Sequence, residues 1–340
     1  MSENTTEDFL DEDFLDDSQF PRDVFTLKQL RSGAILLHIL GIFYAILGIA
    51  LVSKEYLVPS LAVLIEKLGI SRKSIGATVV IIGLLLPSLI TSIIGTFVSF
   101  NAVSIGGLVG SSVFNVTVLL GICACAITQP PLQLKWIPIC RDFGFYLGSL
   151  ILICLFFMDN KMVWYENLVL ILMFGVYILV MIFYGKKVEN SPIVEQVEMK
   201  QENGENGPNS EDNISIGEPI ELFWPRSCGK KVLYIIAMPI LLPIWLILPD
   251  VKNPEKSKFF ILTYLGSIIF LGIFSYLLVW WTTVVGGTFG IPPVLLGFTV
   301  LAIGMIFPSL YTLLFFGRNK LGSSFVAALF GLNIFDITIA

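Results

Sequence analysis

Long apolar runs limit most strongly how this chain can fold. A helical span needs about 20 mostly apolar residues to cross roughly 30 Å of hydrocarbon. We expect such spans near residues 34–53, 75–98, 103–127, 142–158, 162–184, 232–249, 258–281, 291–316 and 322–340, of which the fourth and sixth are short. The sequence therefore predicts an all-α polytopic membrane protein with about nine spans.

Composition excludes several other classes of protein. Only 14% of the residues are charged, against roughly 25% in soluble domains. Acidic residues outnumber basic ones by 26 to 21, which argues against a nucleic-acid binder with a basic face. The sequence contains no nucleophile–base pair, phosphate-binding loop or metal-ligand motif. We therefore expect a lipid-embedded protein that is not an enzyme and uses no cofactor.

A polar stretch at residues 185–231 divides the chain after the fifth span. It has too few apolar residues to order itself, so we expect a flexible loop. Basic residues flank it, namely Lys186, Lys187, Arg226, Lys230 and Lys231, which places it in the cytoplasm by the positive-inside rule. Five preceding spans then put the N-terminus outside, in agreement with the nine acidic residues of the tail 1–33.

These boundaries predict four parts. They are an acidic extracellular tail at 1–33, a first membrane domain at 34–184, the cytoplasmic loop at 185–231 and a second membrane domain at 232–340. In the tail, Asn4 begins an Asn-Thr-Thr glycosylation sequon, although a chance match is the alternative. Because the last apolar run reaches Ala340, we expect the chain to be a fragment, an incomplete gene model or a short isoform.

An internal repeat links the two membrane domains. Residues 76–89 and 297–310 align at an offset of 221 with eight of 14 positions identical, and the same offset aligns 108–117 with 329–338. We expect the first repeat to cover 75–127 and the second 291–340. The second span should start inside and the eighth outside, so the repeats would have opposite orientations, as in inverted-repeat secondary transporters.

Both repeats carry the same predicted helix break. Gly83 precedes Pro87 by four residues, and Gly304 precedes Pro308 in the same way. Proline has no N–H to donate and kinks a helix, while glycine leaves backbone carbonyls accessible to an ion. Packing through small residues is the alternative, but the duplication favours a substrate site near the membrane midplane.

Several segments resemble the potassium-dependent sodium/calcium exchangers of the cation/calcium exchanger superfamily. They are Phe20-Pro-Arg-Asp-Val-Phe-Thr, Glu55-Tyr-Leu-Val-Pro-Ser60, Gly76-Ala-Thr, Val109-Gly-Ser-Ser-Val-Phe-Asn115, Arg141-Asp142 and Asn333-Ile-Phe-Asp336. The resemblance implies a fold of ten spans in two inverted halves, of which the second would be incomplete here. It also implies plasma-membrane antiport of sodium against calcium plus potassium, with transported ions and no cofactor.

The resemblance also implies which residues bind the ions. Family acids follow both repeat prolines, but these positions are Ser88 and Ser309 here, whereas the acid associated with potassium dependence is retained as Asp336. A family serine matches Ser92. The full set of candidate ion ligands is Thr78, Ser88, Ser92, Ser111, Asn115, Thr299, Ser309, Asn333 and Asp336.

The loss of two acids bears on the choice of ion. Tight calcium sites use several carboxylates among six to eight oxygen ligands. Calcium beside Asp336 alone would leave a net positive charge in the membrane, at a cost of at least about 3 kcal/mol. The sequence thus leaves two hypotheses open. One is a cation antiporter with altered ion choice; the other is a transport-inactive or monovalent-selective paralogue that regulates exchangers as a homo- or hetero-oligomer.

Overall fold

The computed structural model is helical throughout the part that it describes. It describes residues 20–21, 23–67, 85–99, 103–122, 136–159, 163–189, 228–253, 255–306, 310 and 322–338, and these ranges contain no strand. Five helices are long and apolar enough to cross a membrane: Leu27–Leu64, Val103–Ile122, Trp136–Phe156, Trp164–Met181 and Ser257–Phe289. The predicted all-α membrane fold is confirmed.

The number of spans stays a prediction, because other apolar helices are shorter. They are Leu85–Val98, Ile235–Ile247, Pro293–Ile306 and Leu329–Thr338. The labelled helices are α2 (Leu27–Gln29), α3 (Ile35–Val52), α4 (Val58–Lys67), α6 (Val103–Phe114), α8 (Trp136–Phe156), α9 (Trp164–Glu189), α11 (Cys228–Ile247), α12 (Phe260–Phe289), α13 (Pro293–Leu296) and α15 (Gly322–Thr338). Short π-helical segments adjoin them, namely η1 (Leu30–Ala34), η2 (Ser53–Leu57), η3 (Gly95–Ser99), η4 (Asn115–Leu119) and η7 (Gly297–Leu301). Two short segments are 3-10 helices, namely η5 (Phe157–Asp159) and η6 (Ser257–Phe259).

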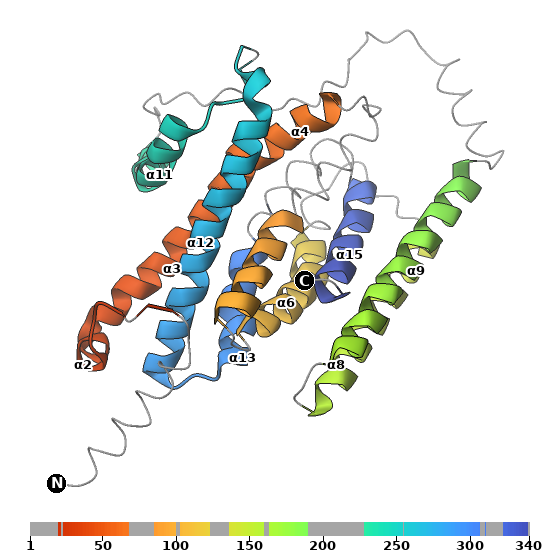
Figure 1. Cartoon of the computed structure of the whole chain (residues 1–340), viewed down its shortest axis with the longest axis horizontal. Helices are drawn as coiled ribbons and strands as arrows, with labels where there is room; N and C mark the ends of the chain where they lie inside the picture. Colours follow the sequence, from red (N-terminus) through yellow and green to blue (C-terminus); the bar gives the residue numbers. More distant parts are fainter. Residues whose placement is uncertain are drawn as a thin grey trace.

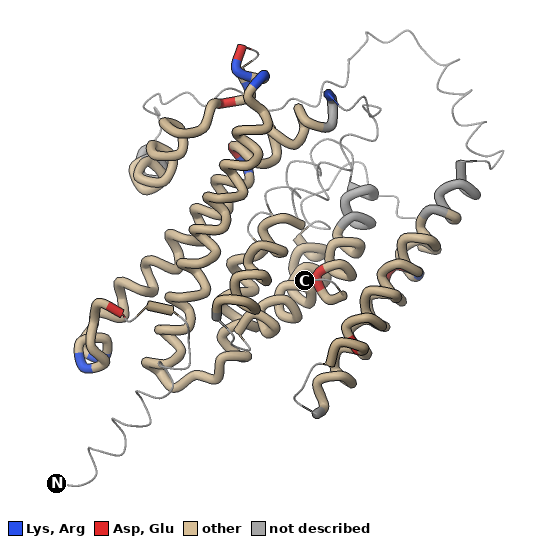
Figure 2. Tube along the Cα trace, in the orientation of Figure 1, with Lys and Arg blue, Asp and Glu red and all other residues tan. Residues whose placement is uncertain are grey.

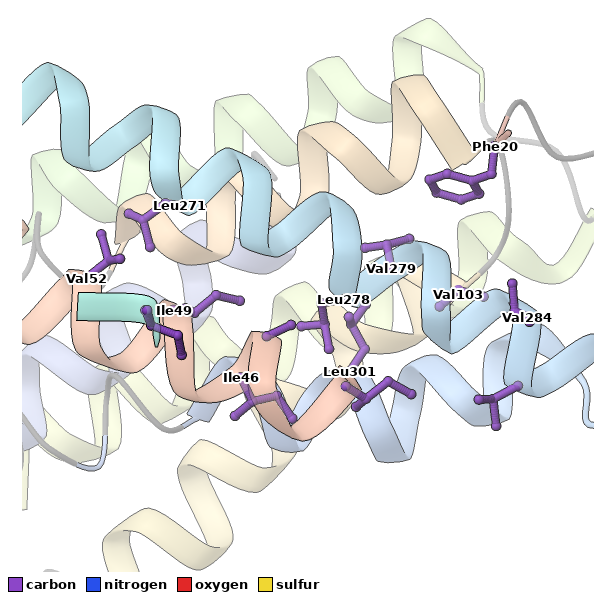
Figure 3. Close-up of a cluster of buried hydrophobic side chains, with 14 of the residues drawn as sticks. Phe20, Ile46, Ile49, Val52, Val103, Leu271, Leu278, Val279, Val284 and Leu301 are labelled. Atoms are coloured by element: carbon purple, nitrogen blue, oxygen red, sulfur yellow. The ribbon is translucent and has the colours of Figure 1, made fainter. Parts of the chain in front are cut away.

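Helices α3 and α12 pack side by side in opposite directions (Figure 1). The ring of Trp281 in α12 lies against Gly41 in α3. The ring of Phe274, seven residues before Trp281, lies against Gly48, seven residues after Gly41, so the two helices are antiparallel. Ile46, Ile49 and Val52 of α3 face Leu271 and Leu278 of α12 in a buried cluster that also takes in Val103 of α6 and Leu301 of η7 (Figure 3). Close packing of these side chains stabilises the pair.

The first helix continues well beyond the predicted span at 34–53. It runs through the polar turn Ser53–Leu57 and ends in α4. The structure tolerates the charge there because Lys252, from the linker before α12, forms an ion pair with Glu55, and Lys54 lies 2.7 Å from the same carboxylate. Because the Glu55 carboxylate has such partners, the helix can continue past it and beyond the predicted span.

The two repeats cross each other at glycines. The second helix of the first repeat, α6, packs on η7 of the second repeat. A Cβ on Gly297 would overlap the carbonyl oxygen of Val103, and a Cβ on Gly110 would lie 2.6 Å from the carbonyl oxygen of Phe298. Only residues without a side chain let two helix backbones approach so closely.

A second buried cluster joins α15 to α8 and α9. It contains Tyr146, Tyr177, Leu329 and Phe330, and the rings of Tyr146 and Phe330 meet edge to face at 6.4 Å. The end of the second repeat is thereby held against the first half of the chain. Acidic and basic residues gather mainly near helix ends, while most of each helix is uncharged (Figure 2).

Candidate cation site

The described parts of the two repeats meet at a buried hydrogen bond. The hydroxyl of Ser88, in the helix Leu85–Val98, donates to Oδ1 of Asp336 in α15 over 2.9 Å. Ser88 is 7% exposed and Asp336 is 2% exposed. The bond joins residues that are 248 positions apart in the sequence, so the carboxylate of one repeat faces the proline-adjacent position of the other.

A pair of buried amides includes Asn333, three residues before Asp336, and Asn115 from the first repeat. Asn115 Nδ2 donates to Asn333 Oδ1 over 2.9 Å, and both residues are at most 3% exposed. The other two amide atoms, Asn115 Oδ1 and Asn333 Nδ2, have no hydrogen-bond partner in the part of the chain that the structure describes. A buried oxygen without a partner carries an uncompensated desolvation cost, which a bound cation would offset.

Helix geometry explains why these side chains converge. Asn333 and Asp336 are three residues apart on α15 and therefore share one face of the helix. Asn115 is the first residue of the widened turn η4 within the second helix of the first repeat. Such turns often occur at functional sites, because the extra residue shifts the direction of the neighbouring side chains.

The neighbouring serines are buried but differ in their hydrogen bonds. Ser92 lies four residues after Ser88, hence on the same helix face, is 1% exposed, and its hydroxyl has no partner among the described residues. Ser111 donates to the carbonyl oxygen of Leu108 over 3.0 Å. Of the two, Ser92 is therefore the more available to a ligand.

Of the remaining predicted residues that the structure describes, Thr299 and Gly304 have other neighbours. Thr299 is exposed and donates to the carbonyl oxygen of Leu295. Gly304 is in the Pro293–Ile306 helix, where a Cβ would lie 3.1 Å from the side chain of Ile46 and 3.2 Å from that of Leu278. Pro87 is buried at the start of the described helix. The positions outside the described residues are Asn4, Thr78, Gly83, Pro308 and Ser309.

The environment of Asp336 differs from that of two carboxylates that form ion pairs, the buried Asp142 and the half-buried Glu55. Asp142 lies 2.7 Å from Nη2 of Arg141, and Glu55 pairs with Lys252. The contact described for Asp336 is a neutral hydroxyl. In the part of the chain that the structure describes, no three His, Cys, Asp or Glu residues come together as metal ligands. The cluster thus offers one carboxylate together with hydroxyl and amide oxygens, which suits a transported alkali or alkaline-earth cation.

Two polar contacts did not emerge from the sequence. Thr91 bonds to Ser275 of α12, and its repeat counterpart at the offset of 221 is Thr312, a match that could have drawn attention to it. The second contact joins His38 to Asp23, with 3.1 Å between Nε2 and Oδ2. His38 lies in the first helix and is 5% exposed.

Comparison with known proteins identifies the family. The model of the sodium/calcium exchanger protein family matches residues 38–183 and 259–340. The sodium/potassium/calcium exchanger 2 of Gallus gallus is 30% identical over 449 residues, covering 94% of this chain and 69% of the relative. The Homo sapiens exchanger 2 is 29% identical over 460 residues with the same coverage, and the Gallus gallus exchanger 1 is 29% identical over 485 residues, covering 99% of this chain and 73% of the relative.

No solved structure gives a significant match. The family match covers both halves of the chain and omits residues 184–258, which include the predicted loop and α11. The matched ranges contain the described candidate ligands Ser88, Ser92, Asn115, Asn333 and Asp336. The chain therefore belongs to the sodium/calcium exchanger family, in the group of the sodium/potassium/calcium exchangers, and is an integral-membrane cation antiporter rather than an enzyme.

Proposed function

We propose that this protein is a plasma-membrane antiporter that exchanges monovalent cations at a site centred on Asp336. The ligands would be the Asp336 carboxylate, the Ser88 and Ser92 hydroxyls and the amide oxygens of Asn115 and Asn333. One observation carries the proposal: Asp336 is buried with a neutral serine hydroxyl as its described partner. A sodium or potassium ion would make such a site neutral.

Calcium suits the same site less well. One carboxylate and a divalent cation leave one positive charge in a region where an unpaired charge costs at least about 3 kcal/mol. That energy corresponds to about a 100-fold loss of affinity. Ser88 occupies the position that carries an acid in the family, and Ser309 does the same in the second repeat. Thr78, Ser111, Thr299 and Ser309 remain candidate ligands of other states of the transporter.

Two further candidate functions compete with this proposal. The relatives are named as exchangers of sodium, potassium and calcium, which favours calcium transport in this chain as well. The loss of two acids instead favours a transport-inactive subunit that assembles with exchanger paralogues. We propose monovalent exchange because the buried Asp336 retains a charge that an inactive subunit would not need.

The test is ion flux in liposomes that contain the purified protein. A sodium gradient should drive uptake of radioactive rubidium, a potassium substitute, while uptake of radioactive calcium should be at least about 100-fold slower. Asp336→Asn should abolish rubidium uptake. Thr338→Val is the matched control, because the Thr338 hydroxyl donates to Ile334 of its own helix.

Each outcome selects one candidate function. Fast calcium uptake that needs potassium would overturn monovalent exchange in favour of the activity of the relatives. Folded protein that moves none of the three ions would favour the regulatory subunit, and co-purification with an exchanger paralogue would then be the next measurement.

A further inference from the structure

A second hydrogen-bonded contact connects the first repeat to α12. Thr91, in the helix Leu85–Val98, lies with its hydroxyl oxygen 2.9 Å from that of Ser275. Thr91 is 1% exposed and Ser275 is 0% exposed. Neither residue belongs to the cluster around Asp336, and Ser275 lies outside both repeats.

The direction of these hydrogen bonds follows from the number of protons. The Thr91 hydroxyl donates to the carbonyl oxygen of Pro87 over 2.8 Å. A hydroxyl has a single proton to donate, so Thr91 can only accept from Ser275. The contact is therefore a directed chain, from the Ser275 hydroxyl to the Thr91 hydroxyl to the Pro87 carbonyl.

The chain of bonds ends next to the cation site. The carbonyl of Pro87 belongs to the peptide bond whose nitrogen is that of Ser88, and Ser88 donates to Asp336. Thr91 is three residues after Ser88, so the two side chains leave neighbouring positions on the helix surface. Fixing the Pro87 carbonyl fixes the plane of this peptide, and with it the position from which the Ser88 side chain extends.

We propose that Thr91 and Ser275 are positioning residues that hold the Pro87–Ser88 peptide in the geometry needed for cation binding, and so connect α12 to the site. This inference rests on the proposed function of the Asp336 site. The two residues act through Ser88 and do not touch the cation. Their loss should weaken apparent cation affinity and leave the amount of folded protein nearly unchanged.

Three variants test the inference through the KM for rubidium. Thr91→Val removes both hydrogen bonds with little change of volume, and Ser275→Ala removes one. We expect KM to rise about three- to tenfold for Ser275→Ala, as for one neutral hydrogen bond, and further for Thr91→Val. Thr91→Ser keeps the hydroxyl, so its KM should stay within about twofold of the wild-type KM. That change is smaller than the loss of one hydrogen bond would cause.

The double variant should resemble Thr91→Val alone. Once Thr91 has lost its hydroxyl, Ser275 has nothing left to act on, so the two changes should not be additive. Additive effects of Thr91→Val and Ser275→Ala on KM would overturn the directed chain.

Helix α12 supplies closely matched controls. The hydroxyl of Ser267 is equally buried but donates to Tyr264 of its own helix, and that of Thr282 donates in the same way to Leu278. Ser267→Ala and Thr282→Val should leave KM unchanged at equal amounts of folded protein. The inference is wrong if Ser275→Ala and Thr91→Val match these controls.

Cation-dependent thermal stabilisation of the purified protein separates this inference from the proposed function. A wild-type protein that shows no flux but is stabilised by sodium or rubidium would contradict transport, while weaker stabilisation in Ser275→Ala and Thr91→Val would still support the positioning role. Flux in the wild type with equal KM in all variants would reject only the positioning role. Absence of both flux and stabilisation would reject both.

Discussion

Ser88 places a neutral hydroxyl beside Asp336, and under the proposed function this position would decide how much negative charge faces a cation. Its oxygen lies 2.9 Å from Oδ1 of Asp336. A carboxylate on this side chain would share the site with Asp336, where two like charges repel each other unless a cation separates them. The charge of the site should therefore set its choice between monovalent and divalent ions.

Ser88→Glu should increase calcium uptake by at least about tenfold, because two carboxylates neutralise a divalent ion and remove much of the charge cost. Rubidium uptake should fall in the same variant. The measurement is uptake of both ions in liposomes, and Ser88→Gln serves as the control of equal size without the charge. Equal calcium uptake by the two variants would show that charge at this position does not select the ion.

Single residues also show what the sequence could predict. The repeat offset identified Asn115 and Asp336 as counterparts, and both are buried. It did not predict that Ser88 would bond to Asp336, or Asn115 to Asn333, because these bonds connect the repeats. Contacts of that kind depend on the packing of one repeat on the other, and a local pattern does not contain this information.

Among the elements, the crossing of α6 and η7 sets the distance between the repeats. Gly106, Gly110 and Gly297 bring the two backbones together, and Ser111 and Asn115 follow on the same α6–η4 helix. A larger residue at the crossing would separate the helices and with them the ligands that come from different repeats.

Gly297→Ala should therefore reduce the yield of folded protein and lower its thermal stability, since the new methyl group would overlap the Val103 carbonyl oxygen. Overpacking of this kind costs about 1–3 kcal/mol or more. Gly272→Ala, on α12, is the control because its Cβ would meet nothing within 4 Å. Size-exclusion profiles and melting temperatures of the two variants measure the difference. If both melt like the wild type, the crossing tolerates a side chain and the glycines do not set the helix distance.

Helix lengths show a second limit of sequence analysis. The apolar run at 34–53 predicted one span, whereas the helix that contains it continues past this run through η2 and α4 to Lys67. At its start, Gly33 has a positive φ of 123°, and this kink separates the helix from α2. The span was predicted to end at residue 53 because charged residues follow near Glu55. The partner that makes these charges compatible with a helix is Lys252, and it is distant in sequence.

For the whole molecule, the directions of three helices determine how the halves are arranged. Helices α3 and α9 begin at the lower side of the molecule and end at its upper side, while α12 runs the opposite way (Figure 1). The end of α9 and the start of α12 thus lie on the same side. The segment between them, which includes α11, makes no net crossing from one side to the other.

This arrangement reconciles two sequence expectations that disagree with each other. If residues 232–249 crossed the membrane, the eighth predicted span would start inside, and the repeats would share one orientation. If they do not cross, it starts outside and the repeats are inverted. The apolar part of α11, Ile235–Ile247, is short, and the helix contains Pro239 and Pro243. We therefore expect α11 to lie along the cytoplasmic surface of the membrane.

Labelling with a membrane-impermeant maleimide tests this topology. Lys256 is exposed in the linker between α11 and α12, and Met158 is 78% exposed between α8 and α9. Lys256→Cys should react only after the cells are permeabilised, because we expect the linker to lie on the cytoplasmic side with the loop 185–231. Met158→Cys should react in intact cells. The unmodified chain, with its five cysteines, gives the background, and a cysteine at Asn209 in the loop marks the inside. Labelling of Lys256→Cys in intact cells would mean that α11 crosses the membrane, and the two repeats could then not be inverted with the first five spans as predicted.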